Sequence, residues 1–371
     1  MTERVLITGG AGFIGSHLAD ELLAHGYRVR LLDNLNPQVH GPDARRPSYL
    51  DERAELLVGD VTNPAAVSRA LEGVDKVVHL AAAVGVGQSM YRIREYTHTN
   101  NVGTAVLLEG LAKQKVARLV VASSMSVYGE GRYRGAHGDV CDHVERSFDD
   151  LRAGTWEPRD EDGQRLVPVP TPEEKAPALS SVYALSKYDQ ERLCLIVGRA
   201  YGIPTVALCL FNTYGTRQAL SNPYTGVLAI FAARLLNGKA PAVFEDGQQR
   251  RDFVCVRDVA RAFRLALESE RAVYSAINVG SGTSTNILDV ARRLSQILGA
   301  PISADITGKY RVGDIRHCFA DVNRARTLLG YVPQITLDEG LQELARWLRA
   351  TNAVDRFDAA RRELEMRGLT L

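Results

Sequence analysis

The sequence predicts an α/β fold: a doubly wound parallel sheet followed by a smaller, mixed α/β lobe. Two features of the sequence predict it. Short apolar runs rich in Val, Ile and Leu alternate with amphipathic helical patterns through the first half of the chain, and this order is typical of a parallel sheet covered by helices. Beyond about residue 212 the alternation becomes irregular, and the 371 residues are enough for a second part.

The first predicted strand, residues 5–8, runs into glycines and then into a helix predicted over 13–25. In the spacing of Gly10, Gly12 and Gly15, the first glycine permits a tight turn, the second a close approach of a pyrophosphate, and the third close packing of the helix. Free N–H groups at the start of the helix attract phosphate. This is the pattern of a Rossmann dinucleotide-binding unit, and its candidate cofactor contacts are Gly9, Gly12, Phe13, Ile14 and Gly15.

An acidic residue follows the second strand. Residues 27–32 predict this strand, and Asp33 ends it, eighteen positions after Gly15. A carboxylate at this place accepts hydrogen bonds from the adenosine ribose and repels a 2′-phosphate, so NAD is favoured over NADP. Asp33 could instead only cap a loop, but the shared register of strand, glycines, helix and acid favours the cofactor. Asn34, beside it, is a further cofactor candidate.

Three more strands are predicted, over 55–58, 75–79 and 118–122. Because ligands of doubly wound sheets bind at the carboxyl ends of the strands, the residues that follow each strand are cofactor candidates: Asp60 and Val61, then Leu80, Ala81 and Ala82, then Ser123. Asp60 can reach the adenine end of a cofactor. It could instead be the N-cap of a helix near Pro64, although Thr62 or Asn63 could fill that role.

A long helix is predicted over 90–113, and Asn100 on it is a further cofactor candidate. Residues 130–179 then break the alternation, since they are charged, dotted with proline and without periodicity. A loop of this length is usually a lid, a binding loop or a disordered insert. Cys141 and His143 are only two candidate ligands, too few for a structural zinc site, so we expect no metal.

The helix predicted over 182–201, with Ser180 or Ser181 as its N-cap, carries the candidate chemistry. Tyr183 and Lys187 are four residues apart and share a face. A nearby ammonium, together with the charge of a nicotinamide, would lower the pKa of the phenol, so that tyrosine could act as a general base. The spacing is common by chance. Here the pair follows a strand that ends in Ser123 and Ser124, and this position favours a catalytic role. Ser124 could form a hydrogen bond to the same substrate hydroxyl that Tyr183 deprotonates.

The rest of the chain predicts a sixth strand over 205–210, helices over 227–237, 256–269 and 287–298, short strands over 242–244 and 276–279, and two or three closing helices. We therefore predict a Rossmann domain over 1–212, which contains the insert 130–179 and is rejoined by 255–280. Residues 213–371 are predicted to form mainly the substrate lobe.

Composition limits the partners and the compartment. The net charge is +1, from 45 basic and 44 acidic residues, which gives no electrostatic case for nucleic acid or an anionic membrane. The five cysteines form no CxxC pair, so a reducing, cytoplasmic compartment is expected. No apolar run approaches the roughly 20 residues of a membrane span, and the first apolar run is too short for a signal peptide.

Together these motifs resemble an extended short-chain dehydrogenase/reductase and, within that group, the nucleotide-sugar epimerase/dehydratase family. The resemblance covers roughly residues 4–348, and its motifs are Gly9-Gly10-Ala11-Gly12-Phe13-Ile14-Gly15, Asp60-Val61, Leu80-Ala81-Ala82, Ser123-Ser124-x-x-Val127-Tyr128-Gly129 and Tyr183-x-x-x-Lys187. It implies a bound NAD, a catalytic triad of Ser124, Tyr183 and Lys187, and a lobe that holds the nucleoside diphosphate of a sugar. It also implies a homodimer in which helices 90–113 and 182–201 form a four-helix bundle.

The resemblance further implies substrate contacts. Asn212 matches the family's diphosphate-binding Asn, and Arg251 its phosphate-binding Arg. An ion pair between Arg251 and Asp252 remains an alternative. Two more matches are Arg311, expected on phosphate, and Asp314, expected near the ribose, both within the family's Arg-x-Gly-Asp motif. The other expected contacts are Phe244 against the base, Ser124, Val86 and Val227.

The residues after Ser124 indicate the reaction. Family dehydratases have an acidic pair there and decarboxylases usually a Glu, whereas this chain has Met125 and Ser126. The resemblance therefore implies an NAD-dependent nucleotide-sugar 4-epimerase, an isomerase that works through a transient 4-keto intermediate with Tyr183 as base. The alternatives are a net reductase of a 4-keto sugar, disfavoured by Asp33, and a non-catalytic relative, which would be expected to lack Tyr183 or Lys187.

The insert 130–179 narrows the resemblance. Compact UDP-glucose 4-epimerases carry a much shorter connection, and residues 150–158 and 168–173 are more similar to bacterial dTDP-L-rhamnose 4-epimerases. The hexose and the base, dTDP or UDP, stay open.

Overall fold

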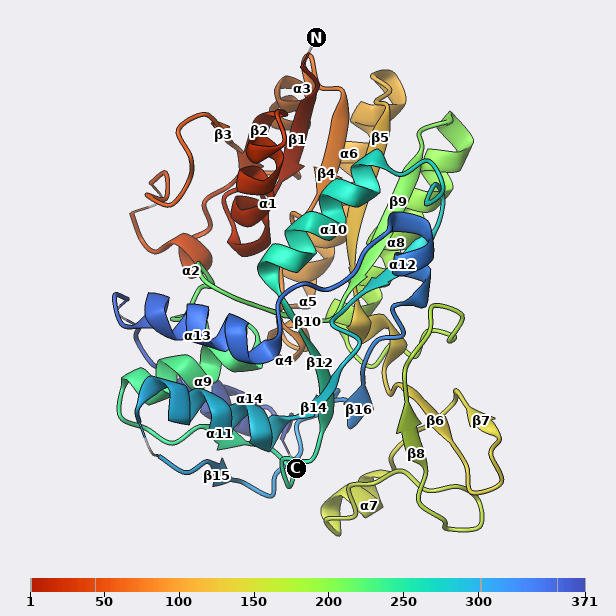
Figure 1. Ribbon diagram of the computed structural model, residues 1–371, viewed down its shortest axis with the longest axis vertical. Helices are drawn as coiled ribbons and strands as arrows, with labels where there is room; N and C mark the ends of the chain where they lie inside the picture. The colour runs from red at the N-terminus through yellow and green to blue at the C-terminus, as the bar shows by residue number, and fades with distance from the viewer. Residues whose placement is uncertain (1, 44, 301, 352, 371) are drawn as a thin grey trace.

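The computed structural model describes residues 2–43, 45–300, 302–351 and 353–370. Its centre is a parallel sheet with the strand order β13-β9-β5-β4-β1-β2-β3 (Figure 1). These strands are β1 (Arg4–Thr8), β2 (Arg28–Asp33), β3 (Glu55–Val58), β4 (Lys76–His79), β5 (Arg118–Ser124), β9 (Thr205–Leu210) and β13 (Ala276–Val279). Strand order reverses at β1, which pairs with both β2 and β4. This is the predicted doubly wound sheet, and all carboxyl ends face one edge.

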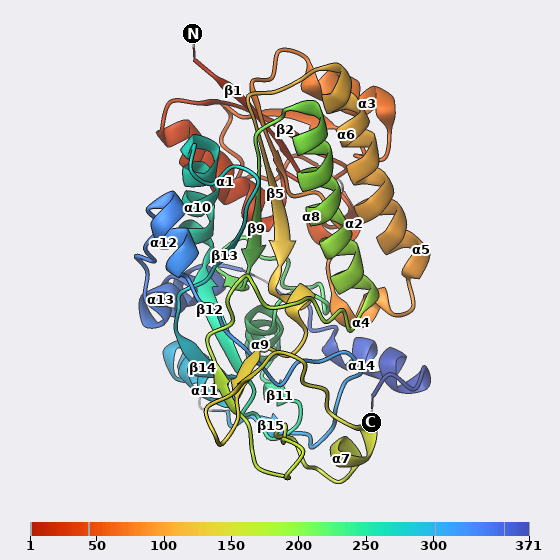
Figure 2. The same cartoon turned by 90° about the vertical axis from the view of Figure 1, so that its right-hand side faces the viewer.

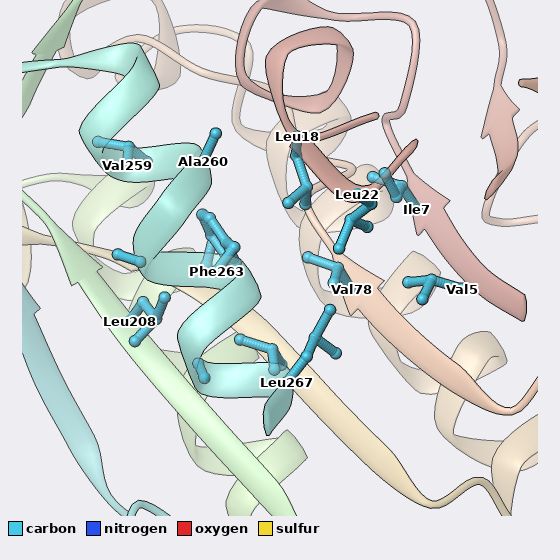
Figure 3. Packing of buried hydrophobic residues seen from close by; sticks show 14 of the residues in the cluster. Val5, Ile7, Leu18, Leu22, Val78, Leu208, Val259, Ala260, Phe263 and Leu267 are labelled. Carbon is cyan, nitrogen blue, oxygen red and sulfur yellow. The ribbon is translucent and has the colours of Figure 1, made fainter. Parts of the chain in front are cut away.

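Helices cover both faces of this sheet (Figure 2). One face carries α1 (Phe13–Ala24), α10 (Val256–Glu268) and α12 (Asn323–Leu329), and the other carries α3 (Pro64–Leu71), α6 (Gly103–Lys113) and α8 (Val182–Tyr201). Figure 3 shows Leu18 and Leu22 of α1 beside Phe263 and Leu267 of α10, all buried. Val259, Phe263 and Leu267 recur every four residues, so α10 turns an apolar face towards the sheet.

The segment predicted as one helix over 90–113 is interrupted. It consists of α5 (Ile93–Tyr96), a π-helical stretch (Thr97–Val102) and α6, and the short helix α4 (Val86–Ser89) precedes it. The π-helical stretch is tied to its surroundings, because the Asn100 side chain accepts a hydrogen bond from Ala83 N at 2.7 Å and donates to Ser186 Oγ at 2.8 Å. These contacts are distant in sequence, so periodicity alone could not predict the break.

The insert is folded rather than structureless. It forms a small antiparallel sheet of β6 (Arg132–Arg134), β7 (Val140–Cys141) and β8 (Val167–Val169), with the short helix α7 (Phe148–Arg152). Strands of two or three residues show no detectable alternation, which is why the sequence predicted only a loop. In Figures 1 and 2 the insert lies beside the C-terminal lobe, below the main sheet.

The C-terminal lobe has its own core. Strand β12 (Arg250–Cys255) pairs with β10 (Asn212–Tyr214), β14 (Ser284–Asn286) and β16 (His317–Cys318), and β11 (Ala242–Val243) pairs with β15 (Asp305–Ile306). Apolar side chains of α9 (Val227–Leu236), α11 (Ile287–Leu298) and α13 (Leu337–Leu348) pack together, and α14 (Phe357–Met366) closes the chain. Among the described residues, no helix is long and apolar enough to cross a membrane.

Candidate functional site

A cavity of about 610 Å³ lies at the carboxyl edge of the main sheet and reaches residues of the C-terminal lobe. Its size is typical of a small-molecule site. Most of the predicted cofactor, catalytic and substrate residues line it: Gly9, Gly12, Phe13, Ile14, Gly15, Asp33, Asn34, Asp60, Val61, Leu80, Ala81, Ala82, Ser123, Ser124, Tyr183, Lys187, Asn212 and Val227. The chain thus brings these residues to one place, although their individual roles remain predictions.

The glycines of the turn after β1 have structural roles that differ from the predicted ones. The positive φ of the tight turn, 69°, is at Gly9 rather than Gly10. A Cβ at Gly10 would lie 2.6 Å from the Leu31 side chain, and one at Gly15 only 2.7 Å from Gly10 Cα, so both positions serve close packing. At Gly12 the nearest atom to an added Cβ is Gly9 O at 3.3 Å.

The start of α1 fits a dinucleotide. Gly12 is its N-cap in an extended conformation, and in the part of the chain that the structure describes no side chain caps this helix. Its first N–H groups therefore remain available at the wall of the cavity, where they and the helix dipole favour phosphate oxygens.

Two carboxylates mark the other end of the cofactor region. Asp33 accepts hydrogen bonds from Ala11 N at 3.0 Å and Leu35 N at 2.9 Å, so it shapes the loop and also lines the cavity. Asp60 accepts from Asn34 Nδ2 at 2.9 Å. The N-cap of α3 is Asn63, whose side chain accepts from Ala65 N, so the alternative role of Asp60 as N-cap is excluded.

Tyr183 and Ser124 meet where β5 and α8 approach each other. Ser181 caps α8 by accepting from Ala184 N at 3.1 Å, so the helix begins just before the tyrosine. Burial raises the pKa of Tyr183, and hydrogen bonding with Ser124 acts in the opposite direction. In the protein alone, burial therefore outweighs the lowering that the sequence suggested.

Lys187 lies one turn further along α8. Burial lowers its pKa to about 8, so its ammonium is mostly charged at neutral pH. Its Nζ donates to Gln190 Oε1 at 2.6 Å, and Gln190 Nε2 donates to Thr104 Oγ1 at 2.9 Å. The lysine is thus fixed by an amide that is itself tied to α6. Asn100 does not line the cavity. It bonds Ala83, which does, and so supports the wall.

The remaining predicted substrate residues gather next to the cavity. The Arg311 guanidinium lies 5.5 Å from the Phe244 ring centroid and 2.6 Å from Asp314 Oδ1. We call Phe244, Arg311 and Asp314 the Phe244 cluster. Helix α4 joins it to the cavity, because Gln88 lines the cavity, whereas a Cβ at Gly87 would lie 3.7 Å from Arg311 Cδ.

Val86 and Arg251 border the Phe244 cluster. A Cβ at Gly313 would lie 3.5 Å from Val86 Cγ1. Arg251 donates to Arg316 O at 3.0 Å and to Ile315 O. The buried carboxylate of Asp252 instead accepts from Ser281 and Gly282, so the ion pair between Arg251 and Asp252 does not form.

Several cavity residues had no signal in the sequence. Gln38 Nε2 donates to Gln88 Oε1 and Asn222 Oδ1, each at 3.1 Å, and so joins the short helix α2 (Pro37–His40), α4 and the loop that carries Asn222 beside the cavity. His40 also lines it, with Nε2 3.5 Å from Asp33 Oδ1. These side chains come from a loop and from helices of four residues, which are too short to show periodicity, and only the folded chain brings them together. No group of three or more metal-ligating side chains occurs among the described residues.

Comparison with known proteins identifies relatives over almost the whole chain. The model of the "NAD dependent epimerase/dehydratase family" matches residues 5–146 and 158–280. A dTDP-L-rhamnose 4-epimerase of Burkholderia thailandensis is 37% identical over 350 residues, which cover 93% of this chain and 95% of that protein.

Solved structures show the same architecture. The UDP-glucose 4-epimerase of Thermotoga maritima, solved with UDP-glucose, is 30% identical, with a TM-score of 0.76 over 94% of this chain and 99% of that one. The UDP-glucuronic acid 4-epimerase of Bacillus cereus, solved with UDP-glucuronic acid and NAD, is 28% identical, with a TM-score of 0.77 over the same shares.

Proposed function

This chain belongs to the NAD-dependent epimerase/dehydratase family, and from that premise we propose that it is a nucleotide-sugar 4-epimerase that acts on a dTDP- or UDP-hexose. One observation carries the proposal: Ser124, Tyr183 and Lys187 line the same cavity as the glycine turn and Asp33. A reacting sugar carbon could then contact both the phenol and the cofactor. The 37% identity to a dTDP-L-rhamnose 4-epimerase favours this reaction and a thymine base.

In the proposed reaction Tyr183 accepts the proton of the C4 hydroxyl as general base. Ser124 forms a hydrogen bond to the same hydroxyl, which orients it towards the phenol oxygen. Burial raises the pKa of Tyr183, and we expect the Lys187 ammonium, one helical turn away, to act against this rise once substrate and cofactor are bound. When bound, NAD supplies reversible hydride acceptance from C4. The residues that would hold it are the glycine turn, Asp33 and the carboxyl ends of β3, β4 and β5.

Dehydration and decarboxylation are less well supported. Elimination of water needs an acid and a base beside the catalytic Ser, but Met125 is buried in an apolar cluster. Ser126 donates from its hydroxyl to Ser124 Oγ at 2.8 Å, so it orients Ser124 rather than providing an acid. With no ionisable side chain at either position, the proton transfer to and from C4 by Tyr183 is the chemistry that these residues support.

For the nucleoside diphosphate we propose Asn212, Arg251 and Arg311 as phosphate contacts, because guanidinium groups bind phosphate bidentately. Asn212 Oδ1 is buried without a hydrogen-bond partner among the described residues, as expected for a side chain that awaits a ligand. Phe244 would pack on the base and Asp314 would bond the ribose. The remaining proposed contacts are Val86 and Val227.

We also propose a homodimer through α6, α8 and the π-helical stretch. The two helices lie side by side on one face of the sheet (Figure 2). Val102 of the π-helical stretch is 42% exposed, and Leu185 and Ile196 of α8 are 47% and 56% exposed. A second copy that packs against the same face would bury these side chains in a four-helix bundle.

The test is a panel of dTDP- and UDP-hexoses incubated with the protein without added cofactor and separated by chromatography. We expect 4-epimers of at least one substrate. Substrate deuterated at C4 should keep its label in the product, whereas exchange with solvent would contradict the proposal. A net reductase would instead consume NADH in step with product, which absorbance at the NADH band detects.

A further inference from the structure

The insert, residues 130–179, is fixed to the lobe beside the Phe244 cluster. Near its start, Gly131 N donates to His317 O at 2.7 Å, and near its end Thr171 N donates to Phe319 O at 2.8 Å. Both anchors lie a few residues after Asp314. The family model leaves residues 147–157 of the insert unmatched, whereas Gly131 and Thr171 lie in matched segments.

Arg146, from the insert, contacts both sides of the Phe244 cluster. Its side chain is 4% exposed, and its Nη1 lies 2.8 Å from Glu245 Oε1. Its Nη2 donates to Asp314 O at 3.0 Å. Glu245 directly follows Phe244, so one guanidinium bridges the segment that carries the aromatic ring and the segment that carries the carboxylate.

Two further contacts fix the guanidinium of Arg146. Its Nε lies 3.0 Å from Glu130 Oε1, and its Cζ lies 5.1 Å from the Tyr310 ring centroid. Glu130 also accepts from Arg316 N at 2.7 Å. The Arg146 side chain therefore has partners on every polar edge and little freedom to move.

A second buried cation completes the connection. Arg316 has a fully buried side chain, with Nη1 2.7 Å from Glu245 Oε2 and Nη2 2.6 Å from Glu157 Oε1. Glu245 thus lies between two guanidinium groups, and its backbone has a positive φ of 53°. A non-glycine residue holds that conformation only where its surroundings fix it. The two ion pairs hold the side chain of Glu245, and hydrogen bonds from Glu245 N to Lys309 O at 2.8 Å and from Gly308 N to Glu245 O at 3.2 Å hold its main chain, directly after Phe244.

We infer that Arg146 is a positioning residue for the nucleoside end of the substrate, and that the insert acts through it to fix the spacing between Phe244 and Asp314. This inference rests on the proposed function, in which those two residues contact the base and the ribose. Two residues that are already held at a fixed spacing need no ordering when the ligand arrives, so the expected gain is in affinity for the nucleotide rather than in the chemical step.

The experiment measures the affinity of purified, NAD-loaded protein for dTDP and UDP by calorimetry, together with KM and kcat for the active nucleotide sugar. The variants are Arg146→Met, which removes the charge, and Arg146→Lys, which keeps the charge but replaces the planar guanidinium, whose separate nitrogens contact Glu245 and Asp314, by a single nitrogen. The matched control is Arg132→Met in the same insert, because the Arg132 side chain is ion-paired only with Asp142, at 2.7 Å, among the described residues.

We expect both Arg146 variants to weaken nucleotide binding by about tenfold and to raise KM similarly, with kcat within about twofold of the wild type. The Arg132 variant should bind as the wild type does. If Arg146→Met does not fold, the test rests on Arg146→Lys, because the lysine keeps a cation beside the buried carboxylate of Glu245.

Four results would overturn the inference. Unchanged affinity in folded Arg146→Lys would show that the contact does not position the site. A loss confined to kcat would place the effect in the chemical step, and a loss of bound NAD in both Arg146 variants would indicate a general structural role. If the wild type itself bound neither dTDP nor UDP, the proposed function would fail, and the inference with it, whereas the other three results leave the proposed function intact.

Discussion

The Lys187 ammonium donates to Gln190 Oε1 at 2.6 Å, three residues along the same helix. This neutral acceptor, rather than a carboxylate, is the hydrogen-bond partner of the buried cation, whose pKa burial lowers to about 8. Lys187 therefore loses its charge at a pH only slightly above neutral. A substitution of its partner Gln190 should change the pKa of Lys187 and with it this pH.

The Gln190→Met variant should lower the pKa of Lys187 further, because the charged form loses its acceptor. If the ammonium supports the Tyr183 phenolate, the alkaline limb of the pH profile of kcat moves down by about one unit. Gln190→Glu is the matched control, because a carboxylate favours the ammonium and should move the limb upward. Superimposable profiles for all three proteins would contradict a role for the Lys187 charge.

Replacement of Tyr183 by Phe should leave the bound NAD in place and lower kcat by a factor of about 10² to 10⁴, since only the phenol oxygen is removed. The measurements are the cofactor content of the purified protein and the rate of epimer formation. Tyr201→Phe, at the exposed end of the same helix, should be as active as the wild type. Full activity of the Tyr183 variant would refute the assigned base.

The Asp33→Asn variant should bind NAD more weakly and discriminate less against NADP, by about tenfold, because the charge that repels a 2′-phosphate is gone. Titration of cofactor-free protein with both dinucleotides measures this. Asp51→Asn is a suitable control, since Asp51 pairs with Arg53 in an exposed loop. An unchanged ratio of the two affinities would show that Asp33 acts only on its own loop.

Charge at the proposed dimer face should separate the subunits. Ile196→Glu would bury a carboxylate in the bundle, so we expect a monomer at micromolar concentration in sedimentation velocity. Ile306→Glu, at a residue of similar exposure (50%) on β15, should leave the assembly unchanged. A wild-type protein that sediments as a monomer would contradict the dimer itself.

Acid should destabilise the protein partly through His79. Burial lowers its pKa from 6.5 to about 3. As the pH falls through 6.5, the unfolded chain therefore binds a proton at this histidine, whereas the folded protein binds it only near pH 3. The free energy of unfolding decreases over this pH window. Between pH 7 and pH 5 this one group accounts for a loss of about 2 kcal/mol.

His79→Gln should remove that part of the pH dependence, even if lost contacts with Thr8 and Thr104 lower its stability at every pH. Urea unfolding at pH 7 and pH 5 gives the difference for each protein. His143→Gln, on the exposed surface of the insert, should retain the full difference. A variant at position 79 with the wild-type difference would show that another group is responsible.

The elements that sequence predicted well are those whose signals are local. Helix α8 has an N-cap at Ser181 and ends at Gly202 with a φ of 67°, and both residues can be recognised in the chain. Strand β9 matches its predicted bounds, 205–210, because it is apolar throughout and buried on both faces. The order of strands and helices then determines the doubly wound sheet.

The parts that sequence could not predict depend on distant contacts. The π-helical stretch is held by Asn100 through Ala83 and Ser186, and none of these is a neighbour in sequence. The glycine motif located the turn, but only the backbone shows that Gly9, not Gly10, has the positive φ. In the site, residues within motifs reach the cavity, whereas Gln38 comes from the four-residue helix α2 and Asn222 from a loop, and neither segment has a periodic signal in the sequence.

The ion pairs of Arg316 limit how chimaeras of this protein can be built. Its guanidinium forms ion pairs with both Glu157 of the insert and Asp246 of the lobe. Removal of either part would therefore leave this buried cation with fewer carboxylate partners. A hybrid with a short hairpin in place of residues 130–179 would strip one counter-ion from a cation with no access to water. The unit to transplant is therefore the insert together with residues 244–246 and 310–318, moved as one block.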